Sequence, residues 1–206
     1  MYAPAHFASQ DLATLDALFA RDAFVTLISS DPNGLPFASH LPVLYRRREQ
    51  QIQIRGHWAR ANPQSEHQGA VLLIVHGPHG YISPTWYSDP DHQVPTWNYA
   101  VAHLRGQLRR IDDEAGKQAL VAELAAVYES GENSWRFPES APSKLKSLRG
   151  IVGFEFELSS MAVKCKFNQN HPPANIRGAI AGLSQLGASG QELAAWMDRA
   201  NFGTAL

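Results

Sequence analysis

The sequence predicts an α+β protein in which antiparallel strands close into a barrel and helices flank it. Three observations carry this prediction. Strand-like segments follow one another through the first half, turn sequences join them into hairpins, and the strongest helical patterns gather in the second half. No low-complexity linker interrupts the chain, so we expect a single domain over residues 1–206 that ends in helices.

The first half reads as one helix followed by strands. Residues 9–22 place Leu and Phe side chains on one helical face, and residues 23–29 are strand-like. Asp31 to Gly34 predicts a turn, because Pro32 presets φ and Gly34 accepts a left-handed conformation. Further strands are expected over residues 37–45, 52–57 and 70–77.

The second half contains longer elements. Residues 98–112 alternate as one long strand, and residues 113–131 form the clearest helical pattern. Residues 150–160 and 161–167 are expected to pair as a late hairpin. Two helices then close the chain, over residues 175–186 and 191–200.

Composition narrows the classes of function. The formal net charge of −1 provides no positive field for nucleic acid or anionic lipid, so DNA is not an expected partner on charge. A single cysteine, Cys165, excludes an intrachain disulfide and fits a reducing compartment. The start of the sequence lacks a signal-peptide pattern and no apolar run reaches membrane-spanning length, so we expect a cytoplasmic protein.

Motifs for hydrolysis, nucleotide binding and metal binding are missing from the sequence. None of the nine histidines pairs with another at the His-x-x-x-His spacing of a helical metal site, so no metal is expected. Neither a Gly-x-Ser-x-Gly elbow nor a Gly-rich phosphate loop occurs. Cys165 lies between two lysines in a strand-like segment, where its side chain is expected to face the core.

The segment RGHWARANPQ, residues 55–64, suggests an anion site. If the strand ends near His57, the next residues form a short helical turn that stops at Asn62, because a residue before proline disfavours the α conformation. Free N–H groups of residues 58–60 and the Arg60 guanidinium would then bind an anion. A strand end with a solvated arginine is the alternative.

Other polar residues favour the anion site. Ser39 and His40 lie in an earlier strand, and the late segment VKCKFNQN adds cations and amides. Its members are Lys164, Lys166, Asn168, Gln169 and Asn170. Cations, amides and aromatic planes without a nucleophile suit a flat, polar, phosphorylated cofactor better than bond hydrolysis.

Seven segments extend this interpretation along essentially the whole chain. In order they are MYAPAHF, GLPFASHLPVLY, GHWARANPQ, GPHGYISPTWY, VPTWNYAVAHLRG, IVGFEFEL and KFNQN. Together they resemble the PaiB-like family of FMN-binding split-barrel proteins, often named negative transcriptional regulators. The resemblance implies a split β-barrel related to pyridoxamine-phosphate oxidases and flavin reductases, with FMN bound at a homodimer interface.

The resemblance also implies roles for particular residues. Ser39 and His40 would face the flavin, and His57 and Arg60 would hold its phosphate. The expected cofactor-binding set also includes Asn62, Trp97, Asn98, Lys166 and Gln169. Asn168 stands where the family pattern has serine, so no direct role is assigned to its side chain.

Two Pro-Thr-Trp tripeptides, residues 84–86 and 95–97, raise a question of their own. Proline can fix a loop so that tryptophan folds onto the protein, and we assign this anchoring role to Trp86. Trp97 opens the long strand that runs along the dimer interface in a split barrel. Its indole is expected to pack against the isoalloxazine ring, with Asn98 bonding the ring edge; a second loop anchor is the alternative.

Three functions follow from these expectations. The first is an FMN-dependent reductase or oxidoreductase on a small substrate, with NAD(P)H as a candidate hydride donor. The second is a transcriptional regulator that uses flavin as a ligand, as the family name suggests, although no helix-turn-helix pattern supports DNA binding. The third is a haem-binding or haem-degrading protein, since relatives with this barrel use haem.

Overall fold

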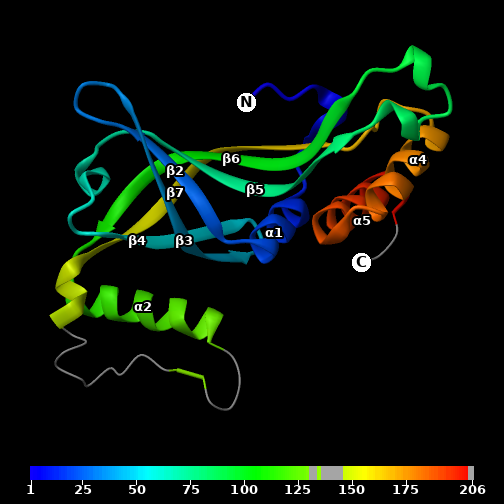
Figure 1. Ribbon diagram of the computed structural model, residues 1–206. Helices are drawn as coiled ribbons and strands as arrows, with labels where there is room; N and C mark the ends of the chain where they lie inside the picture. Colours follow the sequence, from blue (N-terminus) through cyan, green and yellow to red (C-terminus); the bar gives the residue numbers. More distant parts are fainter. Residues whose placement is uncertain (130–133, 136–145, 204–206) are drawn as a thin grey trace. The chain divides into compact units, whose positions relative to one another are not determined.

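The protein is a β-rich α+β structure, as the sequence predicts. The computed structural model describes residues 1–129, 134–135 and 146–203. Seven strands are present in this part: β1 (Ala8–Ser9), β2 (Phe24–Ser30), β3 (Pro36–Arg48), β4 (Gln51–Ala59), β5 (Val71–Ile82), β6 (Thr96–Ile111) and β7 (Ile151–Lys166). The helices are α1 (Leu12–Arg21), α2 (Glu114–Tyr128), α4 (Pro173–Ser184) and α5 (Gly187–Phe202) (Figure 1).

The strands form one sheet in the order β1-β7-β4-β3-β2-β5-β6, and β7 also pairs with β6. This extra pairing joins the two ends of the order into a ring, which leaves only the short β1 outside it. Neighbouring ladders such as β2–β3, β3–β4 and β4–β7 are antiparallel. The closed antiparallel arrangement confirms the predicted split barrel with flanking helices.

Turn chemistry sets the first hairpin. The Asp31 carboxylate accepts hydrogen bonds from the backbone N–H groups of Asn33 and Leu35, each at 2.8 Å. Gly34 has a φ of 81°, in the left-handed region that glycine adopts without steric cost. The turn predicted between residues 31 and 34 is therefore confirmed, and it places Ser39 and His40 on β3.

The late hairpin expected from residues 150–160 and 161–167 is wrong. Residues 151–166 form one continuous strand, β7. The first part of β7 pairs with β4, for example Phe156 with Ile54, and the last part pairs with β1, for example Lys164 with Ala8. Partners for both halves of the strand remove any need for a turn in its middle.

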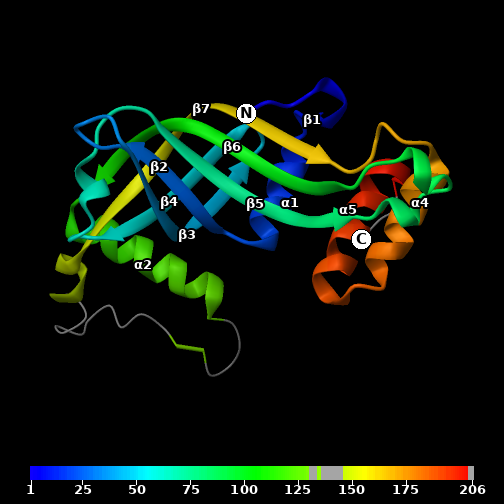
Figure 2. The ribbon, with the colours of Figure 1, turned by 45° about the horizontal axis from the view of Figure 1, so that its top comes forward.

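Helix α2 begins one residue after its cap. The Asp113 carboxylate accepts a hydrogen bond from the N–H of Gly116 at 2.7 Å, which satisfies a free donor of the first turn. The predicted helix over residues 113–131 is confirmed as far as Tyr128, and its last two residues lie outside the described part. The two closing helices are also present, and α4 and α5 lie side by side (Figure 2).

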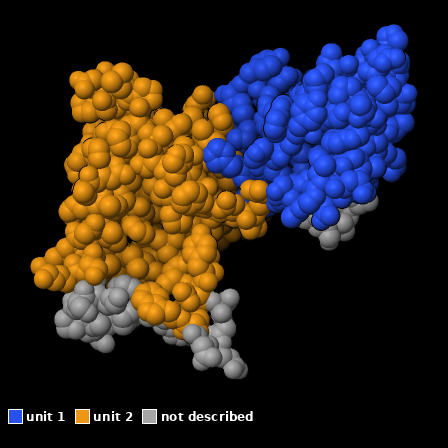
Figure 3. Space-filling view, viewed as in Figure 1, with its two compact units in different colours: residues 1–18, 76–102, 162–206 blue, residues 19–75, 103–161 orange. Residues whose placement is uncertain are grey.

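The chain divides into two compact units (Figure 3). Unit 1 comprises residues 1–18, 76–102 and 162–206, and unit 2 comprises residues 19–75 and 103–161. Each of the strands β5, β6 and β7 contributes residues to both units. The single domain over residues 1–206 stays a prediction.

Each unit has its own buried apolar side chains. In unit 1 many of them come from α1, α4 and α5: Leu15, Leu18, Ala179, Leu183, Leu193 and Met197. In unit 2 they come mainly from the barrel strands and α2: Leu27, Ile54, Trp58, Leu120, Phe154 and Phe156. No helix among the described residues is both long and apolar enough to cross a membrane.

Candidate functional site

The predicted cofactor-binding residues fall into two groups, one in each unit. Unit 2 contains Ser39, His40, His57, Arg60 and Asn62, and unit 1 contains Trp97, Asn98, Lys166 and Gln169. The first group contains the residues expected near the phosphate, and the second contains the tryptophan expected at the flavin ring. Each group has its own geometry.

The backbone around Arg60 differs from the predicted helical turn. Strand β4 continues to Ala59, which pairs with Ile151 of β7. The N–H of Arg60 donates to the carbonyl of Gly150 at 2.8 Å, so it is not free to bind an anion. The predicted helix start at residues 58–60 is therefore wrong, because pairing with β7 extends the strand past His57. Any anion held here depends on side chains.

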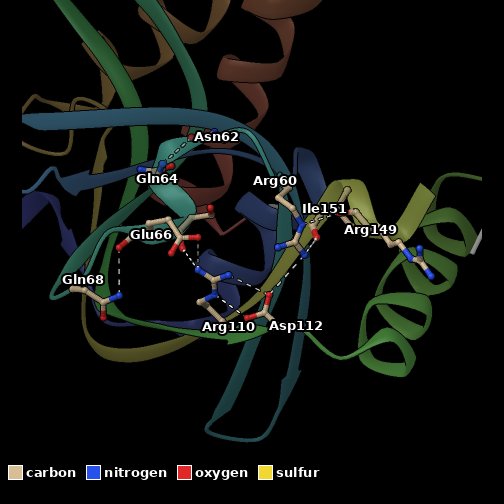
Figure 4. A network of polar contacts seen from close by, with 10 residues as sticks. Arg60, Asn62, Gln64, Glu66, Gln68, Arg110, Asp112, Arg149 and Ile151 are labelled. Carbon is tan, nitrogen blue, oxygen red and sulfur yellow. Dashed lines mark hydrogen bonds and ion pairs between the residues drawn. The ribbon is translucent and has the colours of Figure 1, made fainter. Parts of the chain in front are cut away.

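The Arg60 guanidinium is held in a fixed orientation by backbone carbonyls (Figure 4). Its Nε donates to the carbonyl oxygen of Arg149 at 2.7 Å, and its Nη2 donates to that of Ile151 at 3.1 Å. The side chain is still 48% exposed. Since a guanidinium has five N–H donors, Nη1 still has donors for a ligand.

A second arginine organises the charge beside Arg60. Arg110 binds Asp112 at 2.9 Å and Glu66 at 2.7 Å, and Asp112 also lies 4.0 Å from Arg60. The hydrogen bond from Arg110 holds the pKa of the Asp112 carboxyl below its usual range. Both carboxylates are thus engaged mainly by Arg110, which leaves the charge of Arg60 less compensated.

Asn62 and Ser39 belong to a buried amide network. The Asn62 side chain donates to Ser39 Oγ at 2.9 Å and accepts from the N–H of Gln64 at 3.0 Å, which caps the 3-10 helix η2 (Pro63–Glu66). Gln64 is only 1% exposed. Its amide donates to Leu27 O, Ser29 Oγ and Phe37 O, and accepts from the Trp58 indole at 3.1 Å.

Gln64 is the organising residue that sequence reasoning missed. It fixes η2 against β2, β3 and β4, and so positions the polar groups of Asn62 and Ser39. The only sequence signal was its place after Asn-Pro, which is typical of an ordinary exposed turn.

The two histidines of unit 2 have different surroundings. His40 is exposed, and its Nδ1 lies 3.0 Å from the Thr26 hydroxyl. His57 is half-buried in β4, and burial lowers the pKa of its imidazole. Among the described residues, its buried Nδ1 has no hydrogen-bond partner. His57 therefore combines a lowered imidazole pKa with a buried polar atom that the described chain leaves unpaired.

An exposed aromatic surface distinguishes unit 1. Trp97 at the start of β6 is 55% exposed, and Tyr81 on β5 is 46% exposed. The Trp97 ring centroid lies 6.2 Å from that of Tyr81, edge to face, and 6.4 Å from that of His79. We call His79, Tyr81 and Trp97 the aromatic surface.

Asn98 faces the other way. Successive side chains of a strand alternate between its two faces, and Asn98 is fully buried while Trp97 is exposed. Its amide nitrogen contacts the sulfur of Met197 at 3.3 Å, and within the described chain its Oδ1 has no partner. A ligand packed on Trp97 would therefore lie on the opposite face of β6 from the Asn98 side chain. The role of Asn98 at the flavin edge stays a prediction.

Lys166 and Gln169 mark the end of β7. The Lys166 ammonium donates to the hydroxyl of Thr96, the first residue of β6. Gln169 makes a local turn, accepting from the N–H of Phe167 at 2.7 Å and donating to Cys165 O at 2.6 Å. Lys166 thus supplies a positive charge, whereas the Gln169 side chain stabilises the backbone turn after β7.

Asn168 has a structural reason to replace the expected serine. Its φ is 64°, and asparagine adopts the left-handed conformation more readily than most residues. The buried amide donates to the Tyr87 hydroxyl at 3.0 Å, and the Tyr87 ring stacks on His171 with centroids 5.0 Å apart. Burial and the Lys166 charge lower the pKa of His171.

Trp86 is a loop anchor, as predicted. It ends the 3-10 helix η3 (Pro84–Trp86), and its indole lies against α4. A Cβ on Gly182 would lie 2.3 Å from the indole, and one on Gly178 would lie 2.0 Å from the Trp86 carbonyl oxygen. Only glycine at these two positions permits the contact.

Each unit, taken by itself, offers groups of the kind that bind a phosphorylated flavin. In unit 2, Arg60 offers oriented donors and His57 has a buried nitrogen without a partner in the described chain. In unit 1, the aromatic surface offers a ring to stack against. In the described ranges, no three His, Cys, Asp or Glu side chains are grouped as a metal site requires.

Fold and site together define a split-barrel flavin-binding protein. The chain belongs to the family described as "Putative FMN-binding domain", which it matches over residues 1–160. The prediction of FMN as the cofactor is thereby confirmed at the level of the family, as is the resemblance to the PaiB-like proteins.

Individual relatives agree with this assignment. The chain is 30% identical over 187 residues to "Protease synthase and sporulation protein PAI 2" of Bacillus subtilis, covering 89% of each protein. It is also 30% identical over 169 residues to the uncharacterized protein YKL070W of Saccharomyces cerevisiae, covering 71% of this chain and 99% of that one.

Solved structures share the fold at low sequence identity. The flavocytochrome Anf3 from Azotobacter vinelandii matches with a TM-score of 0.60 and 16% identity, over 78% of this chain and 69% of that one. The FAD and heme binding protein from Mycobacterium smegmatis matches with a TM-score of 0.53 and 14% identity, over 77% and 73%.

Proposed function

We propose that this protein is an FMN-dependent oxidoreductase that acts on a small substrate with NAD(P)H as the hydride donor. The observation that carries the proposal is the aromatic surface of unit 1. The tryptophan is more than half exposed and is flanked by a tyrosine and a histidine, which together form an exposed apolar surface. Such a surface suits the stacking of a flat ring system.

The chain's own residues would bind and orient the cofactor. Arg60 Nη1 would donate to the phosphate, and His57 would bond a phosphate or ribityl oxygen. Trp97 would pack against the isoalloxazine ring, and the ammonium of Lys166 lies beside the first residue of the same strand. FMN, when bound, supplies the hydride and single-electron chemistry, which the side chains named here do not.

A homodimer is part of the proposal. Several large apolar side chains of unit 1 are exposed, namely Tyr2, Tyr81, Val94 and Trp97. Contact with a second copy would remove them from water and would cover one face of a bound flavin. Light scattering is expected to give the mass of a dimer, and a monomer at micromolar concentration would contradict this part of the proposal.

The test of function begins with the purified protein saturated with FMN. We expect a bound-flavin spectrum that NADH or NADPH bleaches in the absence of oxygen and that a small quinone or oxygen restores. A flavin spectrum that neither nucleotide bleaches would contradict the oxidoreductase and favour a flavin-responsive regulator. Failure to bind FMN at all would overturn both.

Two alternatives have distinct outcomes in the same preparation. A Soret band after haem addition would favour a haem protein, which is the class named for two structures of this fold. A regulator, suggested by the sporulation name of the Bacillus subtilis relative, would shift DNA at physiological salt. The net charge of −1 argues against that outcome.

A further inference from the structure

Unit 1 contains a cavity of about 280 Å³ that the proposed flavin site does not use. The start of α1, the end of β7 and the last turns of α5 surround it. Its lining residues are Asp11, Ala13, Thr14, Ala17, Cys165, Phe167, Trp196, Arg199 and Ala200. All of them belong to unit 1, so the cavity is complete within that unit.

Arg199 is the unusual member of this lining. Its Nε and Nη2 are buried, and neither has a hydrogen-bond partner among the described residues. The guanidinium carbon lies 5.6 Å from the centroid of the Trp196 ring, but a ring face provides no acceptor for N–H groups in the guanidinium plane. Buried donors without partners are rare in native proteins and call for an explanation.

The two nitrogens without partners are the ones that a carboxylate recognises. Nε and Nη2 form one edge of the guanidinium, and their parallel N–H groups match the two oxygens of a carboxylate. An arginine keeps its charge at every physiological pH. Neither nitrogen has accessible surface in the structure, so the Arg199 side chain turns toward the cavity when a carboxylate binds and supplies both of the acceptors that the described chain does not.

The rest of the lining defines the body of the ligand. Phe167 and Trp196 are buried aromatic residues, and alanines 13, 17 and 200 leave space between the elements. Burial raises the pKa of the Cys165 thiol to about 11, which keeps that part of the lining uncharged. The lining contains one arginine and one carboxylate, that of Asp11, and this charge balance suits a single negative charge better than a phosphate dianion.

We propose that this cavity is a second ligand site, which binds a small organic monocarboxylate with an aromatic or aliphatic body through the Nε and Nη2 edge of Arg199. The site is distinct from the residues proposed to hold FMN, none of which lines it. It could receive a substrate or an effector, since both classes include small carboxylic acids. The test therefore addresses binding and does not require turnover.

The experiment compares two probes on the protein saturated with FMN. Phenylacetate carries the carboxylate and the ring, and phenylacetamide is its neutral counterpart. Calorimetry is expected to show binding of phenylacetate and at least about tenfold weaker binding of phenylacetamide, because the charge-assisted bidentate pair is lost. Equal affinities, or no binding of either probe, would overturn the proposal.

Cys165 provides a second readout from within the cavity. It is the only cysteine of the chain, so N-ethylmaleimide labelling reports on this site alone. Phenylacetate should slow the labelling at alkaline pH, and phenylacetamide at the same concentration should not. Equal labelling rates with and without phenylacetate would place its binding elsewhere and overturn the assignment.

A matched pair of arginine variants identifies the anion partner. Arg199→Met should weaken phenylacetate binding on the order of tenfold or more. Arg177→Met is the control, because Arg177 also lies over a ring, 4.1 Å from the centroid of Phe202, but does not line the cavity. Similar losses in both variants would contradict a specific role for Arg199.

A third variant keeps the test valid if Arg199→Met does not fold. Ala200 is exposed at the edge of the cavity, so Ala200→Phe adds volume there without removing a buried group. It is expected to abolish phenylacetate binding while FMN binding persists. Unchanged phenylacetate affinity in Ala200→Phe would overturn the proposal.

Discussion

The two units differ in the kind of surface that they offer to a ligand. In unit 2, the polar side chains of Ser39, Arg60 and Asn62 are hydrogen-bonded to the chain itself. In unit 1, the side chain of Trp97 is largely exposed and contacts other rings at its edges. The first arrangement fixes donors in advance, whereas the second leaves apolar area whose burial is gained only when a ligand or a second copy binds. Unit 2 thus offers polar groups that are already oriented, and unit 1 offers apolar area that binding can bury.

The largest effect is expected from the amide network that fixes unit 2. Gln64→Ala removes a buried side chain with four hydrogen-bonded partners, so the free energy of unfolding should fall by about 3 kcal/mol. Denaturant titration measures this fall. Gln68→Ala is the matched control, because Gln68 is exposed and, among the described residues, its side chain bonds Glu66 O alone, at 3.4 Å. The effect of Gln68→Ala should stay within about 0.5 kcal/mol.

The result separates two views of unit 2. If Gln64→Ala were as mild as Gln68→Ala, the network would not hold η2, and the fixed orientation of the polar groups would have another origin. If the folded Gln64→Ala protein kept its FMN affinity, Asn62 and Ser39 would serve the fold alone.

Arg60 tests whether the fixed donors bind phosphate. Arg60→Met should lower the preference for FMN over riboflavin about tenfold, because only FMN carries the phosphate. Taking the ratio of the two affinities cancels any general loss of stability. Arg48→Met, at the exposed β3–β4 hairpin, should leave the ratio unchanged. An unchanged ratio in Arg60→Met would assign the phosphate to other residues.

Trp97 tests the open surface of unit 1. Trp97→Ala should weaken FMN binding by about 1 kcal/mol, the scale of an aromatic contact beyond burial, and should raise the emission of bound flavin. Trp86→Ala should leave the emission unchanged and lower the melting temperature, since its indole packs on α4. Melting is measured without flavin to separate stability from binding. Equal changes in emission from the two variants would make Trp97 a second anchor.

The identical tripeptides show the limit of local sequence. Both tryptophans follow Pro-Thr, yet one is packed and the other exposed. The difference comes from Gly178 and Gly182, which lie about ninety residues later in the chain. Because they have no side chains, α4 leaves space for the indole and carbonyl of Trp86. By contrast, the turn at Asp31 to Gly34 was predictable because its chemistry is contained in four residues.

The errors at β4 and β7 have one common cause. The sequence around Arg60 favours a turn, and residues 150–167 can be divided into two short strands. Pairing with β7 extends β4 to Ala59, and pairing of the two halves of β7 with β4 and β1 keeps β7 continuous. Such pairing cannot be read from segments that lie about a hundred residues apart. The partners of Gln64 are nearer in the chain but lie on three different strands, so no local pattern indicates them.

The smallest effect concerns two histidines and distinguishes the units electrostatically. Burial alone lowers the pKa of His57 in unit 2, whereas burial and the positive charge of Lys166 lower that of His171 in unit 1. Salt screens the repulsion between charges but does not change burial. Raising the ionic strength should therefore raise the pKa of His171 and leave that of His57 nearly unchanged.

NMR titration of the ring protons of both histidines measures this difference, and Lys166→Met supplies the control, since it should remove the salt response of His171. The sign also fixes a pH effect on stability. An unfolded histidine binds a proton at higher pH than either of these half-buried rings, so the contribution of both to stability is complete above the unfolded pKa of about 6.5. This contribution is lost as the pH falls toward the folded values. Replacing His57 by glutamine should reduce this acid-induced loss at every salt concentration. Equal salt responses of the two histidines would contradict the distinction. They would show that the charge of Lys166 does not lower the pKa of His171.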